Sequence, residues 1–242
     1  MKIEGVEVVL LDIEGTILPI DFVKKELYPY ALRGLPKLLD QHFKKPIPAL
    51  VEPIALFPPE VRRSPADLYT HLHDLTEKDI KHPGLKQLQG HVWRQGYRDG
   101  VLRARLFPDV KPAFDRWAAN GKTLAIYSSG SVQAQRLLFQ HVEDPENPGP
   151  DTVKDYEGYF DQNYFDTQNA GMKAEQVSYV KIAAALGKKP ESILFLSDSD
   201  KEVLAAKLAD MQSVLVQRPG NPEQDMAALL DVVGTFDELN LV

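Results

Sequence analysis

Four short apolar runs along the chain predict buried strands. They are Val6–Leu11, Thr123–Tyr127, Ile193–Leu196 and Ser213–Val216. Their length and their β-branched content are typical of strands that are buried on both faces of a parallel sheet. Segments with the spacing of helices accompany them, at Val110–Asn120, Val132–Phe139, Ala174–Leu186 and Glu202–Ala209. Strands that alternate with helices in this way predict a doubly wound α/β domain.

The region between the first two runs does not follow this alternation. Apolar residues in Phe22–Leu39 gather near one face of a helix, and Leu85–Leu102 also has helical spacing. Between them, Lys45–Pro65 holds six prolines, which predict a loop with at most short turns. We therefore expect a core domain of residues 1–18 and 107–242, and a mostly helical insert of residues 19–106 after the first strand. Glu143–Asp151 is expected to form a second proline-rich loop, inside the core domain.

Composition narrows the classes of function. The 242 residues include 35 acidic and 28 basic side chains, for a net charge of −7, and 43% of them are hydrophobic, as in ordinary soluble globular proteins. The chain has no cysteine, which excludes disulfides, thiolate nucleophiles and cysteine-ligated metals. The acidic balance argues against a nucleic-acid partner.

The sequence also gives expectations for location and assembly. No run approaches the length of a membrane span, and the N-terminal residues lack the features of a signal peptide. We expect a cytoplasmic protein without a membrane partner. Because no heptad seam or large apolar stripe requires a partner, we also expect a monomer.

Polar residues follow three of the predicted strands. They are Asp12-Ile13-Glu14-Gly15-Thr16, Ser128-Ser129-Gly130-Ser131 and Ser197-Asp198-Ser199-Asp200. In an open parallel sheet, ligands bind beyond the carboxyl ends of the strands. The three segments therefore predict one site at this edge of the sheet, and their convergence is stronger evidence than any one of them.

The two carboxylates after the first run suit phosphoryl transfer. A carboxylate such as Asp12 can accept a phosphoryl group that water later removes. Glu14 would leave an extended segment on the same side and could act as an acid or a base. An acidic turn between a strand and a helix is the alternative interpretation of these residues.

The other two segments and one lysine could bind an anion and a metal. Ser128 and Ser129 precede a helix, where hydroxyls and backbone N–H groups bind phosphate, although a serine there can also be a simple N-cap. Asp198 and Asp200 supply the oxygen ligands that Mg²⁺ prefers, or else cap the next helix. Lys173 could place one positive charge at a phosphate, or could be an ordinary surface lysine.

In order along the chain, Asp12-x-Glu14-Gly15-Thr16, Ser128, Lys173 and Asp198 resemble the four motifs of the haloacid dehalogenase-like phosphatases. Those enzymes usually have a second aspartate where this sequence has Glu14. With Glu14 at this position, the sequence resembles the enolase-phosphatases of methionine salvage. The segments that carry this resemblance are SSGSVQAQRLLF, YFDT, GMK, and FLSD followed by Glu202 and Ala205-Ala206. FVKKELYPYA and LQGHVWRQGYRDG in the insert are similar to the same family, so the resemblance covers nearly the whole chain.

The resemblance implies a Rossmann-like doubly wound parallel sheet with a mostly helical cap, and a role for each motif residue. Asp12 would be the nucleophile and a ligand of one Mg²⁺ per subunit. Glu14 would be the acid/base and a partner in the metal site, and Asp198 the outer metal ligand. Ser128, Ser129 and Lys173 would contact the phosphate and the substrate.

The resemblance also implies a small-molecule substrate, the phosphorylated diketone 2,3-diketo-5-(methylthio)pentyl 1-phosphate. The enzyme would enolise it and then dephosphorylate it through an aspartyl-phosphate on Asp12, which yields the acireductone and phosphate. The base for the enolisation stays open between Glu14 and a residue of the cap. Val101, the TILPID stretch after the first motif and the loop Glu143–Asp155 depart from the family pattern, and they concern substrate fit rather than the four motifs.

Three other interpretations compete with this one. The chain could be a phosphatase of the same superfamily that acts on another small phosphate ester. It could be a phospho-accepting signalling module, but such modules place the acceptor after a later strand and lack a large insert. It could also be a binding protein on an inactive scaffold, although all four motifs keep their reactive residues.

Overall fold

The computed structural model describes residues 1–144, 147 and 152–242, and the chain divides into two compact units. One unit contains Met1–Asp21 and Arg103–Val242, and the other contains Phe22–Leu102. Most of the proline-rich loop expected at Glu143–Asp151 lies outside the described residues. A cap role for residues 19–106 stays a prediction.

The first unit is built on a parallel sheet of six strands in the order β6-β3-β2-β7-β8-β9. In that order the strands are Tyr164–Phe165, Thr123–Tyr127, Val8–Leu11, Ile193–Ser197, Gln212–Val216 and Val232–Val233. Four of the six are the strands expected from the apolar runs, within two residues at each end. Two pairs of short strands lie outside this sheet, parallel β1 (Lys2–Ile3) with β10 (Asn240–Leu241), and antiparallel β4 (Val142–Glu143) with β5 (Val153–Lys154).

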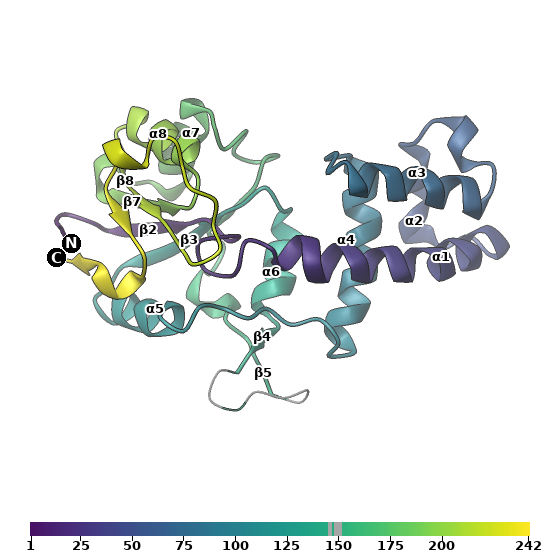
Figure 1. Cartoon of the computed structure of the whole chain (residues 1–242), viewed down its shortest axis with the longest axis horizontal. Helices are drawn as coiled ribbons and strands as arrows, with labels where there is room; N and C mark the ends of the chain where they lie inside the picture. Colours follow the sequence, from purple (N-terminus) through teal and green to yellow (C-terminus); the bar gives the residue numbers. More distant parts are fainter. Residues whose placement is uncertain (145–146, 148–151) are drawn as a thin grey trace. The chain divides into compact units, whose positions relative to one another are not determined.

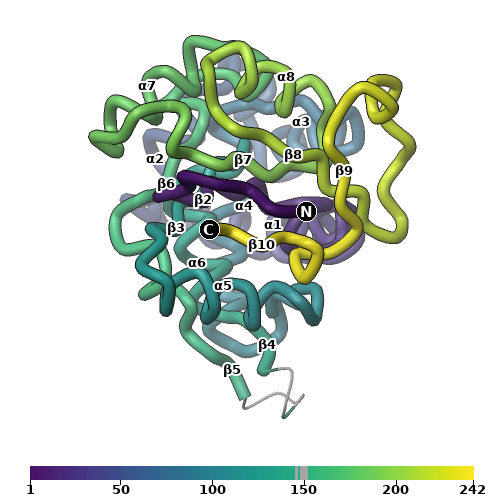
Figure 2. Tube along the Cα trace, turned by 90° about the vertical axis from the view of Figure 1, so that its left-hand side faces the viewer, coloured from purple at the N-terminus to yellow at the C-terminus, as the bar shows by residue number. Residues whose placement is uncertain are grey.

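Helices cover both faces of the sheet, as a doubly wound fold requires (Figures 1 and 2). On one side lie α7 (Gln176–Leu186) and α8 (Asp200–Leu208), and on the other lie α5 (Val110–Ala119) and α6 (Val132–Phe139). Side chains of β2, β3 and β7 share one buried cluster with α7 and α8, including Leu10, Tyr127, Phe195, Ile182 and Ala206. The predicted α/β class is confirmed.

The second unit is helical. It contains the π-helical turn Val23–Leu27 and helices α1 (Tyr28–Lys44), α2 (Pro48–Ala55), α3 (Pro65–Glu77) and α4 (Pro83–Arg98). Its core is a cluster of leucines with a few other apolar side chains from all four helices, among them Leu35, Leu39, Leu50, Ile54, Leu68, Leu72, Leu85, Leu88 and Val92. This unit therefore has a hydrophobic core of its own.

The expectation of a loop at Lys45–Pro65 is wrong, because this segment contains α2 and the 3₁₀ turn Pro59–Arg62. Pro48 begins α2, where a missing N–H costs no helical hydrogen bond and the fixed φ favours the helix. Leu50, Ile54 and Phe57 recur at the spacing of one helix face and are buried in the core of the second unit. Packing of this apolar stripe outweighs the propensity of the prolines to break helices.

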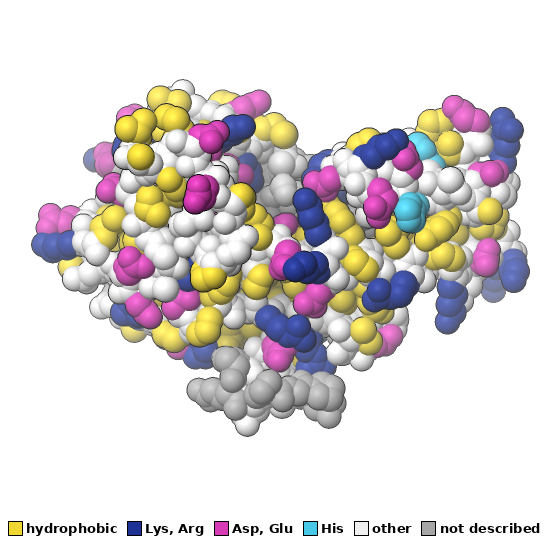
Figure 3. Space-filling view, viewed as in Figure 1, with side chains coloured by type: hydrophobic (Ala, Val, Ile, Leu, Met, Phe, Trp, Pro, Cys, Tyr) yellow, Lys and Arg dark blue, Asp and Glu magenta, His cyan; other side chains and the backbone are white. Residues whose placement is uncertain are grey.

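The remaining short helices are 3₁₀ turns, at Glu157–Tyr159, Pro190–Ser192, Ala227–Leu229 and Phe236–Glu238. No helix in the described part of the chain combines the length and the apolar character needed to cross a bilayer. On the face shown in Figure 3, acidic and basic side chains are interspersed among apolar ones on both units.

Candidate active site

The register of the sheet brings three predicted site residues to one edge. Leu11, the last residue of β2, pairs with Ile126 of β3 on one side and with Leu196 of β7 on the other. Asp12 directly follows β2, Ser128 follows β3 and Asp198 follows β7, so all three emerge at this edge, with Ser128 and Asp198 one residue beyond the level of Asp12. The Asp12 amide still donates to the Leu196 carbonyl, at 2.9 Å, so the start of this turn is held by the sheet.

Lys173 joins this edge through an ion pair with Asp12. Its Nζ lies 2.5 Å from Asp12 Oδ1, and both side chains are at least nine-tenths buried. The loop before α7 carries Lys173, and the Tyr179 hydroxyl on α7 donates to the Lys173 carbonyl at 2.7 Å. The ammonium also lies 5.7 Å from the centre of the Tyr127 ring. Although burial opposes the charge, the nearby carboxylates of Asp12 and Glu202 raise the pKa of Lys173, so it stays protonated.

Glu202 belongs to the same cluster and is the main residue that the sequence reasoning did not assign. Its Oε2 lies 2.6 Å from Lys173 Nζ and accepts a hydrogen bond from Ser197 Oγ at 2.8 Å. Glu202 lies in the first turn of α8, four residues after Asp198. An acidic residue in the first turn of the helix that follows Asp198 lies near the same sheet edge, and this position is the signal that could have given Glu202 a role.

Asp198 lies against the turn that follows β2. Gly15 has a φ of +73°, and a Cβ placed on it would be 2.2 Å from Asp198 Oδ2. Glycine is therefore required here both by the backbone conformation and by the nearby carboxylate. Burial and the negative charges of Asp12 and Glu202 raise the pKa of Asp198 to about 8 in the metal-free protein, although the Lys173 ammonium opposes this shift.

The cluster has the chemistry of a site for a hard cation. Among the described residues, Asp12 and Glu202 share one ammonium, that of Lys173, and Asp198 lies near them, so negative charge is in excess. Excess carboxylate oxygen with no sulfur ligand fits Mg²⁺, which takes one or two carboxylates and completes its shell with other oxygens. In residues 1–144, 147 and 152–242, no group of three or more His, Asp or Glu side chains is arranged so that it could hold a metal ion by itself. Substrate oxygens and water would have to complete the shell.

Glu14 and Asp200 differ in their relation to this edge. Glu14 is half-buried in the turn after β2. The next residue in this turn, Gly15, donates its amide to the Leu18 carbonyl at 2.8 Å. The acid/base role of Glu14 stays a prediction. The Asp200 carboxylate instead accepts from the Met226 amide at 3.1 Å, so this side chain holds the C-terminal segment.

The two predicted phosphate-binding serines differ in exposure. Ser128 is buried and accepts from the Gly130 amide at 3.2 Å, whereas Ser129 is exposed. The N-cap of α6 is Ser131, and Asp166 also accepts from the first amide of the helix, at 2.9 Å. Ser131 and Asp166 therefore already accept hydrogen bonds from amides in the first turn of α6. An anion at this edge would be bound by Ser128 and Ser129 rather than by the amides at the start of α6. That contact stays a prediction for both serines.

Comparison with known proteins identifies the family of this chain. The family model described as haloacid dehalogenase-like hydrolase matches residues 6–210. The enolase-phosphatase E1 of Sordaria macrospora is 48% identical over 97% of this chain and 97% of its own. The enolase-phosphatase E1 of Pyricularia oryzae is 46% identical over 97% of this chain and 99% of its own.

The chain belongs to the enolase-phosphatase family of haloacid dehalogenase-like hydrolases. It is therefore an enzyme, of the phosphatase type. The crystal structure of the UTR4 protein of Saccharomyces cerevisiae has a TM-score of 0.84 and 37% identity, covering 96% of this chain and 99% of that one. CbbY of Rhodobacter sphaeroides, at 16% identity and a TM-score of 0.61, shares the fold.

Proposed function

We propose that this enolase-phosphatase converts 2,3-diketo-5-(methylthio)pentyl 1-phosphate into the acireductone 1,2-dihydroxy-3-keto-5-methylthiopentene and phosphate. One observation supports this chemistry most: the Asp12 carboxylate lies at the carboxyl end of β2, in a buried ion pair with Lys173 and in the same charged cluster as Asp198. A carboxylate that is held in place at a sheet edge by an ion pair suits nucleophilic attack on phosphorus.

The first step is enolisation. A proton leaves the phosphate-bearing carbon C1, the C1–C2 double bond forms, and the C2 carbonyl oxygen takes up a proton. A bound Mg²⁺ would be held by Asp12 and Asp198 and would supply positive charge for the anionic oxygens of the substrate. The Lys173 ammonium adds a fixed charge at the same edge, where it requires no reorganisation during the reaction.

The second step transfers the phosphoryl group to the protein. An Asp12 oxygen attacks phosphorus, the bond between phosphorus and the C1 oxygen breaks, and its electron pair stays on that oxygen. Glu14 gives this leaving oxygen a proton and then takes one from water. The water oxygen attacks phosphorus, the bond to Asp12 breaks, and the free carboxylate returns.

Turnover assays with added Mg²⁺ test this proposal. We expect the diketone phosphate to be converted with a kcat/KM at least about tenfold above that of simple phosphate esters, and chelation of the metal to stop the reaction. Equal or better turnover of another phosphate ester, without any enol product from the diketone, would favour a phosphatase with a different substrate. A phosphorylated protein that does not turn over would favour a signalling role.

A further inference from the structure

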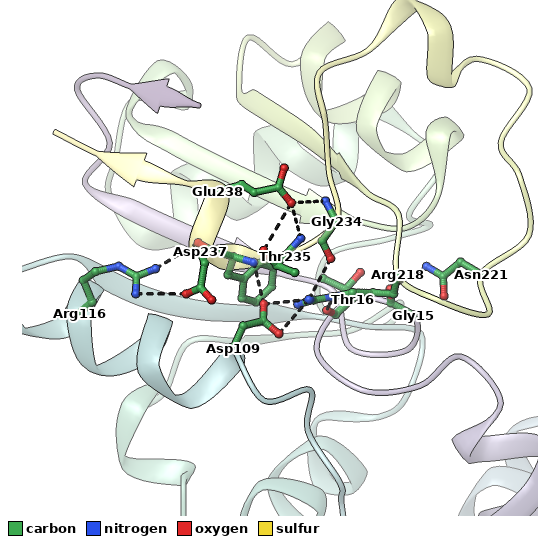
Figure 4. A network of polar contacts seen from close by, with 11 residues as sticks. Gly15, Thr16, Asp109, Arg116, Arg218, Asn221, Gly234, Thr235, Asp237 and Glu238 are labelled. Atoms are coloured by element: carbon green, nitrogen blue, oxygen red, sulfur yellow. Dashed lines mark hydrogen bonds and ion pairs between the residues drawn. The ribbon is translucent and has the colours of Figure 1, made fainter.

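Two side chains from the segment after β8 bind the turn that carries the predicted catalytic carboxylates (Figure 4). Arg218 Nε donates to the Thr16 carbonyl at 2.9 Å, and Asn221 Nδ2 donates to the Gly15 carbonyl at 2.8 Å. These carbonyls belong to the residues immediately after Glu14. The turn is therefore held from a distant part of the chain, 202 and 206 residues away in sequence.

Arg218 is itself fixed on several sides. Its Nη1 lies 2.8 and 2.9 Å from the two carboxylate oxygens of Asp109, and it also donates to the Gly234 carbonyl at 3.1 Å. Its guanidinium lies 4.6 Å from the centres of the Phe107 and Phe236 rings. Because Arg218 is only 3% exposed, it has little freedom to move independently of these partners.

Asp109 connects Arg218 to the C-terminal end of the chain. Its Oδ2, which binds Arg218, also accepts from the Phe236 amide at 2.7 Å. Phe236 begins the 3₁₀ turn Phe236–Glu238. Arg218 thus joins the start of α5, the C-terminal turn and the Thr16 carbonyl in one buried network.

The turn has little room to adopt another conformation. The Gly15 amide donates to the Leu18 carbonyl, and its own carbonyl accepts from Asn221, so both peptide groups of this glycine are held. The backbone of Gly15 also lies close to the Asp198 carboxylate, since even a single added Cβ would come within 2.2 Å of Oδ2. A rotation of this turn would move Glu14 and change the space beside Asp198.

We propose that Arg218 and Asn221 are positioning residues of the enolase-phosphatase reaction. By holding the Thr16 and Gly15 carbonyls they fix the turn that carries Asp12 and Glu14, while Asp109 keeps Arg218 in place. This proposal rests on the proposed function, since it assigns the two side chains a role in the alignment of that reaction and no contact with the substrate.

Asn221→Ala and Arg218→Lys test the proposal, with Glu238→Ala as the matched control. Asn221 is half-buried, so its alanine variant should fold, and Arg218→Lys keeps the charge but loses the fork that reaches several acceptors. Glu238 accepts from the Gly234 and Thr235 amides in the same network, and within the described part of the chain its side chain forms no hydrogen bond with the turn. Each variant is measured for thermal unfolding, for kcat and KM, and for calorimetric binding of orthovanadate as a phosphate analogue.

We expect both test variants to lower kcat by about tenfold to a hundredfold, because small displacements of reacting groups are costly, with KM changed by less than about threefold. Vanadate binding should weaken in parallel. Glu238→Ala should lower the unfolding temperature but keep kcat. If a folded Asn221→Ala variant keeps the wild-type kcat, or if Glu238→Ala loses as much kcat, the positioning role is wrong.

Failure of the proposed function would look different. In that case the wild-type enzyme itself would not convert the diketone phosphate. The positioning role would then be tested with whichever phosphate ester the wild type does hydrolyse, and with vanadate, by the same comparison of variants.

Discussion

Replacement of Lys173 by methionine is the perturbation whose effect the structure defines most sharply. Methionine is also unbranched and fills much of the same space, but it removes the ammonium that lies 2.5 Å from Asp12 and 2.6 Å from Glu202. Removal of one partner from a buried ion pair costs about 3–5 kcal/mol, and loss of one electrostatic contact at a reacting group costs about 3–4 kcal/mol in the transition state. We therefore expect kcat/KM to fall by about a hundredfold to a thousandfold.

The loss of stability in this variant should depend on pH. The raised pKa of Lys173 means that its charge is present at all pH values below its unfolded value and would be lost only in strong alkali. Without this charge, Asp12, Asp198 and Glu202 have no cation among them in the metal-free protein. Burial raises the pKa values of Asp198 and Glu202, so these two side chains can avoid repulsion by binding protons at low pH, and the destabilisation should be larger at about pH 8 than at about pH 5.

Urea unfolding of metal-free protein at both pH values, with kcat/KM in Mg²⁺, measures these effects. Lys181→Met is the matched control, because Lys181 is an exposed residue of the nearby helix α7. The control should behave like the wild type in both assays. A folded Lys173→Met variant with kcat/KM within about threefold of the wild type would refute the assignment of Lys173 to the reacting cluster.

Three further predictions test other parts of the structure. Gly15→Ala should abolish most activity, because a Cβ would lie 2.2 Å from Asp198 Oδ2 and the φ of +73° disfavours alanine. The kinetic control is Gly121→Ala, since Gly121 has a φ of +70° but no neighbouring atom within 4 Å of an added Cβ. Since burial and nearby charges raise the folded-state pKa of Asp198 from 3.8 to about 8, the metal-free protein should lose stability as the pH rises between these values. Added Mg²⁺ should restore stability most near pH 8. In the Asp198→Asn variant, the urea concentration at the unfolding midpoint should depend less on pH than in the wild type. Leu50→Ala, at a side chain 1% exposed in α2, should lower the unfolding free energy by about 2–5 kcal/mol in urea, whereas Val51→Ala, at 49% exposure, should change it by less than about 0.5 kcal/mol.

The parts of the fold that sequence predicts well are those that leave a local pattern. The strands Thr123–Tyr127 and Ile193–Ser197 are continuous apolar runs, because the sheet buries them on both faces. The edge strands Tyr164–Phe165 and Val232–Val233 are two residues long, too short for any periodicity to appear. Helix α2 forms although its prolines predict a loop, because its apolar residues Leu50 and Ile54 are buried in the core of the second unit.

The site residues also differ in how well a local sequence pattern predicts them. Residues that directly follow strands, such as Asp12 and Asp198, can be located once the strands are known, because the register of parallel strands aligns their ends. The sequence gives Glu202 no specific role, because that role depends on the orientation of α8 toward Lys173. Arg218 lies in a polar segment without a motif, and its partners Asp109 and Thr16 are distant in sequence. Such contacts depend on the tertiary structure and leave no local pattern in the sequence.

The central claim is that one site enolises the diketone phosphate and then transfers its phosphoryl group to Asp12. Single-turnover stopped-flow absorbance, with phosphate release followed in parallel, tests it most directly on the wild type and on Asp12→Asn. The wild type should show a transient enol signal that precedes phosphate release. Asp12→Asn, which has no nucleophilic carboxylate, should release no phosphate within the time of many wild-type turnovers. Phosphate release by Asp12→Asn at a rate near that of the wild type would contradict the account.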